Sequence, residues 1–189
     1  MDDTSVALKR RKLNVDDYYR MAEAGILGED GRVEPIDGEL IDMAPIGQDH
    51  VAAVNTLTRA LILACGGRAI VSPRNPARLD WLNEPQPDFA VFRPRPDFYR
   101  TGNRPGPCRR SSPDRGGGSL QFDRVVKLRM YARAGIPEVW IIDLKRRMVD
   151  VQRGPAGDGY QETATHQPAD TMALALAPDI KVPLDSVFG

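Results

Sequence analysis

The chain has 189 residues, 26 basic and 26 acidic side chains, no net charge and 41% hydrophobic residues. This length suits one globular domain with a proper hydrophobic core. A neutral chain is not expected to bind DNA through a broad basic surface alone. A nuclease with an acidic metal site can nevertheless have no net charge. Cys65 and Cys108 match neither a disulfide framework nor a zinc motif, which favours a reducing cytoplasm. No apolar run is long enough to cross a membrane.

The first half of the chain predicts two helices and a hairpin after a disordered lead at residues 1–12. Residues 14–26 form a short helix, with Asn14 as its N-cap and Gly25 at its end. Residues 31–45 form a hairpin around the turn Asp37-Gly38. Residues 48–67 form an amphipathic helix. Its expected apolar positions are Val51, Val54, Leu57, Leu61 and Ala64.

The second half predicts short strands around one further helix. Strands are expected at residues 68–72, 77–81 and 88–94. A helix over 119–135 follows, with Val125 and Val126 directed into the core. The run 138–144 is typical of a buried strand, with 147–153 as its hairpin partner, and 159–166 and 170–176 form a last, more exposed pair. The order predicts a mixed α/β fold with one central sheet in a single domain, residues 13–189.

The segment at about 97–119 does not fit this pattern. Its later part, "CRRSSPDRGGGSL", has no hydrophobic period and three consecutive glycines. A loop of such length without periodic structure is unusual inside a compact domain. The seven arginines between Arg93 and Arg115 have two explanations. They could form a DNA-contacting patch, or they could result from translation in a wrong reading frame, and we favour the wrong reading frame.

The motifs "VEPIDGELIDMAP", His50, "EPQPDFAVFRP" and "FDRVVKLRMYARAGIPEVWIIDL" resemble the Uma-type restriction endonuclease family over about residues 12–175. That family belongs to the PD-(D/E)xK nuclease superfamily. The resemblance implies a restriction-endonuclease-like central mixed sheet flanked by helices, with an N-terminal helix and hairpin. It also implies hydrolysis of DNA phosphodiester bonds with Mg²⁺ or Mn²⁺, and suggests a homodimer by analogy with other nucleases.

The resemblance also assigns four candidate site residues. Asp88, in Pro87-Asp88, matches the superfamily's metal-binding aspartate, and Lys127 matches its lysine, relocated from the sheet to the following helix. Glu34 matches an early acidic residue, and His50 a histidine at the start of the second helix. Mg²⁺ prefers such hard carboxylate oxygens, and an ammonium group can stabilise developing negative charge.

Each of these residues also has an explanation that involves no site. Pro-Asp is a common turn pair, and most such aspartates bind nothing. Lys127 shares a helix face with Asp123 and Tyr131, so a solvated ion pair of small value would explain it. A hairpin carboxylate such as Glu34 is usually solvated, and a histidine in a first helical turn is more often structural.

One departure from the family pattern is severe. Members carry an apolar strand ending in Glu-Val before the last helix, whereas this chain has "CRRSSPDRGGG", so the second metal-binding carboxylate expected near Gly116-Gly117 is absent. Codons for this stretch can be shifted by one base to give "ADVLLLIVEV", an apolar strand ending in a carboxylate. We hypothesise that the stretch is a frameshift product. A genuine surface loop rich in glycine and arginine is the alternative.

The sequence therefore predicts a Mg²⁺-dependent DNA endonuclease, impaired in this copy by the loss of the Glu-Val strand. The alternative is a catalytically dead module that keeps the nuclease fold and serves in DNA binding or protein interaction. A hydrolase of another phosphate ester is a weaker third possibility, since no phosphate-cradling G-x-x-x-x-G-K motif surrounds Gly116–Gly118.

Overall fold

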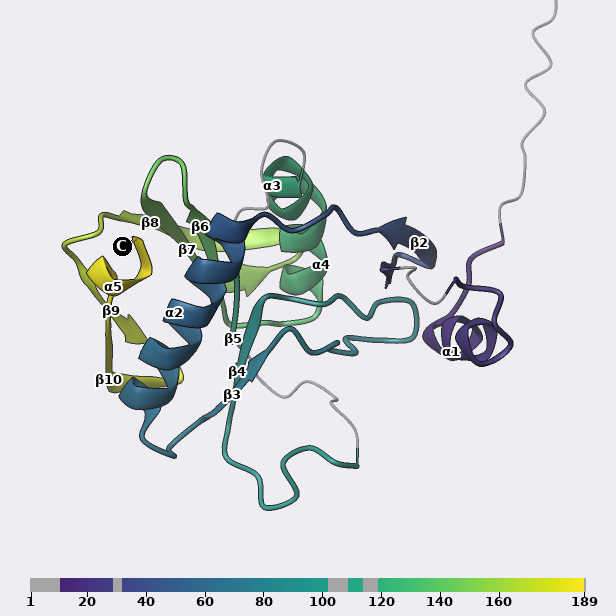
Figure 1. Cartoon of the computed structure of the whole chain (residues 1–189), viewed down its shortest axis with the longest axis horizontal. Helices are drawn as coiled ribbons and strands as arrows, with labels where there is room; N and C mark the ends of the chain where they lie inside the picture. The colour runs from purple at the N-terminus through teal and green to yellow at the C-terminus, as the bar shows by residue number, and fades with distance from the viewer. Residues whose placement is uncertain (1–10, 29–31, 102–108, 114–118, 189) are drawn as a thin grey trace, which may run out of the picture.

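A six-stranded sheet forms the centre of the computed structural model, which describes residues 11–28, 32–101, 109–113 and 119–188. The strand order is β3-β4-β5-β6-β7-β8, and Figure 1 shows helices on both sides of this sheet. β5 and β6 run parallel, whereas every other neighbouring pair is antiparallel. The predicted mixed α/β fold is therefore confirmed. The part of the predicted lead at residues 1–10 lies outside the described residues.

The elements follow one another along the chain with these bounds. The N-terminal part contains α1 (Val15–Glu23), β1 (Val33–Ile36), β2 (Glu39–Asp42), α2 (Gln48–Cys65), β3 (Ile70–Pro73) and β4 (Phe89–Phe92). The middle contains β5 (Arg109–Pro113), α3 (Ser119–Phe122), the π-helical turn η1 (Asp123–Lys127) and α4 (Leu128–Arg133). The C-terminal part contains β6 (Glu138–Asp143), β7 (Met148–Ala156), β8 (Gly159–His166), β9 (Thr171–Leu174), β10 (Ala177–Pro183) and α5 (Asp185–Phe188).

The central strands are buried on both faces, and their side chains alternate between two cores. Phe89 and Val91 of β4 join a cluster with α2, β9, β10 and α5, whereas Ala90 and Phe92 join a cluster with α4. In β6, Trp140 and Ile142 enter the first cluster and Val139 and Ile141 enter the second. This two-residue alternation is the normal consequence of strand geometry. α2 and α4 therefore cover opposite faces of the sheet.

The predicted N-terminal elements are confirmed by their local chemistry. Asn14 caps α1, and its side chain and that of Asp17 bond reciprocally to each other's backbone N–H, as in a capping box. The β1–β2 hairpin turns at Asp37-Gly38, where both residues have positive φ, the conformation that a two-residue type I′ turn requires.

Several sequence predictions were wrong in detail. Residues 77–81 form no strand, because the backbone of this segment bonds to the chain a few residues later, for example from Ala77 N to Pro85 O. The last pair is also different, since β8 pairs with β7 and β9 pairs with β10. Val51 and Val125 are exposed, because the buried face of α2 carries His50 and Ala53 and that of η1 carries Asp123 and Lys127.

The anomalous segment contributes a strand, which the sequence did not predict. We expected the middle of the sheet to lose a strand, but β5 fills this place between β4 and β6. All residues of β4 and β6 are buried. A strand between two such neighbours is usually a run of apolar residues, yet β5 consists of Arg-Arg-Ser-Ser-Pro. The sequence of β5 thus conflicts with its position.

This conflict predicts that an apolar β5 stabilises the protein. Replacing Arg109–Pro113 by Asp-Val-Leu-Leu-Leu should raise the melting temperature by roughly 10 °C, because each buried aliphatic side chain contributes about 1.5–3 kcal/mol. Thermal unfolding followed by circular dichroism measures this. A control with Gln-Thr-Ser-Thr-Thr removes the arginines and the proline without adding apolar area. An equal rise in both variants would contradict burial as the cause.

Candidate active site

One edge of the central sheet collects the predicted site residues. β4 begins at the edge where β5 and β6 end, because β4 and β5 are antiparallel and β5 and β6 are parallel. Asp88 immediately precedes β4, and its side chain is fully buried. The structure therefore does not place Asp88 in a solvated turn.

His50 of α2 contacts Asp88. The His50 Nε2 atom lies 2.9 Å from Asp88 Oδ1, and His50 is only 3% exposed. The two residues are 38 positions apart in sequence, so the pair exists only because the start of α2 packs against the start of β4. A buried carboxylate needs polar partners, and the imidazole ring is one of them. The structure thus joins two of the four candidate residues.

The other two candidates, Glu34 and Lys127, form a buried ion pair. The Lys127 Nζ atom lies 2.5 Å from Glu34 Oε1 and 3.4 Å from Asp123 Oδ1. Lys127 is 6% exposed and Glu34 is 4% exposed. The solvated ion pair considered for Lys127 and the solvated hairpin carboxylate considered for Glu34 are therefore both excluded. A buried pair of this kind is costly to break, because either partner alone would be an uncompensated charge.

A π-helical turn carries both Asp123 and Lys127. The Leu128 N–H donates to the carbonyl of Asp123, five residues earlier, which widens the helix at this point. The sequence predicted one regular helix over this region. Side chains four residues apart lie on the same face of a helix, so Asp123 and Lys127 are neighbours on the face where Lys127 contacts Glu34. Such π turns occur often at functional sites.

Gln86 links the two pairs. Its backbone N–H donates to Glu34 Oε2 over 2.9 Å, two residues before Asp88. Glu34 therefore accepts from Lys127 with one oxygen and from the segment leading to Asp88 with the other. No pattern in the sequence indicates this bond, because it uses a backbone group of a loop.

The charges around Lys127 keep it protonated. Burial alone would lower the pKa of Lys127, but Tyr131, Glu34 and Asp123 outweigh that effect and raise the pKa well above the ordinary lysine value. The ammonium group is thus a fixed positive charge at neutral pH. It can balance negative charge but cannot serve as a general base.

Glu84 is a second buried carboxylate close to the hairpin. Its N–H donates to Pro35 O, and its Oε2 atom has no hydrogen-bond partner among the residues that the structure describes. Burial raises the pKa of Glu84, although Tyr19 and Arg78 act in the opposite direction. Sequence reasoning missed this residue.

The described residues offer few ligands for a metal ion. Within the part of the chain that the structure describes, no three histidine, cysteine, aspartate or glutamate side chains come together as a metal site. The position near Gly116-Gly117, where a second carboxylate was expected, lies outside the described residues. Among the described residues, Asp88 and His50 are the buried pair closest to the start of β4.

The Lys127 cluster predicts non-additive effects on stability. Lys127→Met should reduce the free energy of unfolding by about 3–5 kcal/mol, because it leaves Glu34 buried without its cation. Adding Glu34→Gln to this variant should cost less than Glu34→Gln costs alone. Urea unfolding of the four proteins measures the coupling. Strictly additive losses would show that the two side chains do not interact.

Glu84 predicts a pH-dependent effect. A raised carboxyl pKa means that the folded state favours the protonated form, so the penalty of Glu84 is absent at low pH and appears as the pH rises through its folded pKa. Glu84→Gln should therefore stabilise the protein by about 1 kcal/mol at pH 7.5 and have little effect at pH 4. Urea unfolding at both pH values measures this, and a loss of stability at pH 7.5 would contradict it.

Comparison with known proteins identifies both fold and family. A crystal structure of a putative nuclease belonging to DUF820 from Anabaena variabilis has a TM-score of 0.68 with this chain, at 17% sequence identity. The similarity covers 93% of this chain and 97% of that one, and it shows a shared fold. No curated protein matches the chain. Residues 15–113 and 117–185 match the Uma2 family, described as "Putative restriction endonuclease", and the resemblance noted in the sequence is thereby confirmed. The chain, a nuclease-like protein, belongs to the Uma2 family.

Proposed function

We propose that this chain is a metal-dependent DNA endonuclease whose activity is reduced by the loss of one carboxylate. The observation that supports the proposal best is the meeting of the His50–Asp88 pair and the Glu34–Lys127–Asp123 cluster through Gln86. These groups are buried and charged, which is costly unless they serve one another or a ligand. Perturbed, buried titratable groups of this kind are typical of active sites.

The donor set suits a weakly held divalent cation. Asp88 offers a hard carboxylate oxygen, and one carboxylate with waters and substrate oxygens lies within the usual coordination of Mg²⁺. The imidazole of His50 beside it suits Mn²⁺ better than Mg²⁺. The linked set brings together three buried carboxylates, those of Asp88, Glu34 and Asp123, and carboxylate oxygens are the ligands that a divalent cation such as Mg²⁺ prefers. A bound cation would lower the pKa of a water molecule and polarise a phosphate.

The side chains at this edge of the sheet have different roles in the proposed reaction. Asp88 is the group that would contact the cation, and His50 holds its carboxylate in one orientation. Lys127 supplies a fixed positive charge that partly offsets the phosphate's negative charge. Glu34 and Asp123 are positioning residues, since they hold Lys127 in place and Glu34 also fixes the segment before Asp88.

The strand β5 supports the proposal of reduced activity. The family match is interrupted between residues 113 and 117, directly after β5 and within the anomalous segment. The polar sequence of β5 between two buried strands agrees with the frameshift hypothesis, in which residues 109–113 would be Asp-Val-Leu-Leu-Leu. The same shifted frame places a glutamate at position 116, where this chain has glycine. Loss of that ligand would weaken cation binding.

A catalytically inactive nuclease-fold module remains the alternative. The absence of a three-ligand cluster among the described residues favours it. Such a module would bind DNA without a divalent cation and would not cut it.

Cleavage of supercoiled plasmid with Mg²⁺ or Mn²⁺ tests the proposal. We expect slow nicking by the natural chain, faster nicking with Mn²⁺, and a gain of at least tenfold when residues 108–117 are replaced by "ADVLLLIVEV". Asp88→Asn should abolish nicking, because it removes the charge that holds the cation. Circular dichroism confirms that each variant is folded.

Asp42→Asn is the matched control, because Asp42 is an exposed carboxylate at the end of β2. It should nick as the natural chain does. Equal nicking by the natural and restored chains would refute the reduction in activity. Nicking that survives Asp88→Asn would refute the assigned site, and metal-independent binding without any nicking would favour the inactive module.

A further inference from the structure

Three consecutive basic residues form the turn between β6 and β7. Lys145, Arg146 and Arg147 are all exposed. Seven other arginines whose side chains the structure describes are paired with an acid, for example Arg68 with Asp179 and Arg133 with Asp158. Among the described residues, the three cations of this turn form no ion pair with a carboxylate. In a chain with no net charge, such a cluster of unbalanced cations is a local exception.

The turn has a fixed shape. The backbone N–H of Arg146 donates to Asp143 Oδ1 over 2.9 Å, which closes the turn directly after β6. Arg147 adopts a positive φ of 53°, and its guanidinium donates to the carbonyl of Phe188 and lies over that residue's ring. Arg147 is thus anchored to α5, whereas Lys145 and Arg146 extend from a defined base. Ordering them on a ligand costs less than ordering a flexible loop.

The turn stands at the same edge of the sheet as Asp88. β6 ends where β4 begins, two strands away across β5. Strands lie about 4.8 Å apart and rise about 3.3 Å per residue, so the Lys145 backbone is on the order of 15 Å from Asp88. Long lysine and arginine side chains can cover part of that distance.

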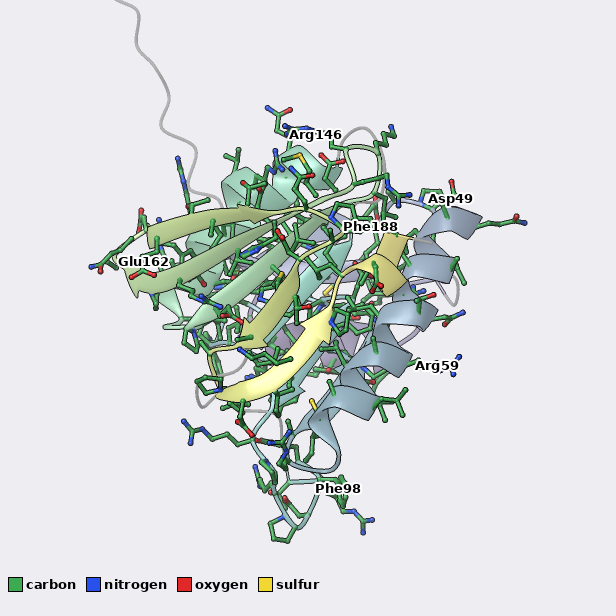
Figure 2. The ribbon with its side chains drawn as sticks, turned by 90° about the vertical axis from the view of Figure 1, so that its left-hand side faces the viewer. Asp49, Arg59, Phe98, Arg146, Glu162 and Phe188 are labelled. Carbon is green, nitrogen blue, oxygen red and sulfur yellow. The ribbon has the colours of Figure 1, made fainter. Side chains whose placement is uncertain are left out.

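A cavity connects the turn with the start of α2. It has a volume of about 380 Å³, and its wall includes Asp49, Thr56, Lys145 and Phe188. Asp49 is adjacent to His50, the partner of Asp88. Figure 2 shows Arg146, Phe188 and Asp49 at the same end of the molecule, with Phe98 at the opposite end. The cavity thus adjoins Lys145 on one side and the first turn of α2, which carries His50, on the other.

We infer that the turn Lys145–Arg147 binds the backbone phosphates of duplex DNA beside the cleavage site, an inference that rests on the proposed function. At about 3.4 Å per base pair, 15 Å corresponds to about four or five base pairs from the phosphate at Asp88. Contacts of this kind fix the register of the duplex and carry no sequence preference. The turn is a binding surface, and the carboxylates at the sheet edge remain the site of chemistry.

Salt-dependent DNA binding tests this inference. The double variant Lys145→Gln/Arg146→Gln should bind a labelled 20-base-pair duplex more weakly than the natural chain in EDTA. The slope of log K against log salt should shrink by about two, because two phosphate contacts are lost. Fluorescence anisotropy over a range of salt concentrations gives the slope. Lys145→Arg, which keeps the charge, should leave it unchanged.

The control is Arg59→Gln/Lys181→Gln, which removes the same charge from exposed positions on α2 and β10. Equal slopes for the two double variants, or no binding by the natural chain, would overturn the inference. A smaller salt slope in the turn variant alone supports the inference. If that slope is smaller but no nicking is found, only the catalytic proposal fails. If the natural chain nicks DNA but the two double variants have equal salt slopes, the nuclease proposal stands and the turn is refuted as a DNA-binding surface.

Discussion

The carboxylate of Glu34 holds three separate segments of the chain together. One oxygen contacts the Lys127 ammonium group on the π-helical turn, and the other accepts from the Gln86 backbone before β4. The β1–β2 hairpin that carries Glu34 is a separate two-stranded sheet. Backbone N–H groups also join the hairpin to the loop before β4, from Asp37 to Asn83 Oδ1 and from Glu84 to Pro35 O, and Glu34 adds the ion pair with the π-helical turn. Because the groups are buried, the bridge fixes their relative positions much more strongly than a surface ion pair would.

The bridge explains why buried charged residues lie together at one edge of the sheet. Asp88 follows Gln86 by two residues and is fixed from the other side by His50 of α2. Elements from both faces of the sheet thus define the surroundings of a single carboxylate. The weak point is β5, whose polar sequence occupies a position between two fully buried strands. This polar strand is the observation behind the proposal that the activity of the chain is reduced.

Local sequence signals predicted much of the fold and little of the site's geometry. Asn14, Asp37-Gly38 and Gly66 mark the ends of their elements by capping and turn chemistry that acts over a few residues. The strand at 77–81 was wrong, because backbone hydrogen bonds to residues 83–85 override a weak β pattern there. β10 was missed, and the pairing of β8 was wrong, because strand partners depend on contacts distant in sequence.

The four candidate site residues came from the family resemblance, and their burial could not have been inferred from composition. Glu34 and Lys127 have the sequence context of solvated residues, yet a π turn and a hairpin distant in sequence bring them together. Gln86 takes part through its backbone, which no pattern of side chains reveals. Glu84 is buried by the packing of its loop against β1.

Binding of Mn²⁺ in the absence of DNA, followed by electron paramagnetic resonance, tests the role of this edge most directly. Free Mn²⁺ gives a signal that diminishes when the ion binds to protein. We expect the natural chain to diminish the signal through one weak site, and Asp88→Asn to lose that binding while Asp42→Asn retains it. Identical titration curves for the natural chain and Asp88→Asn would contradict a cation held at Asp88.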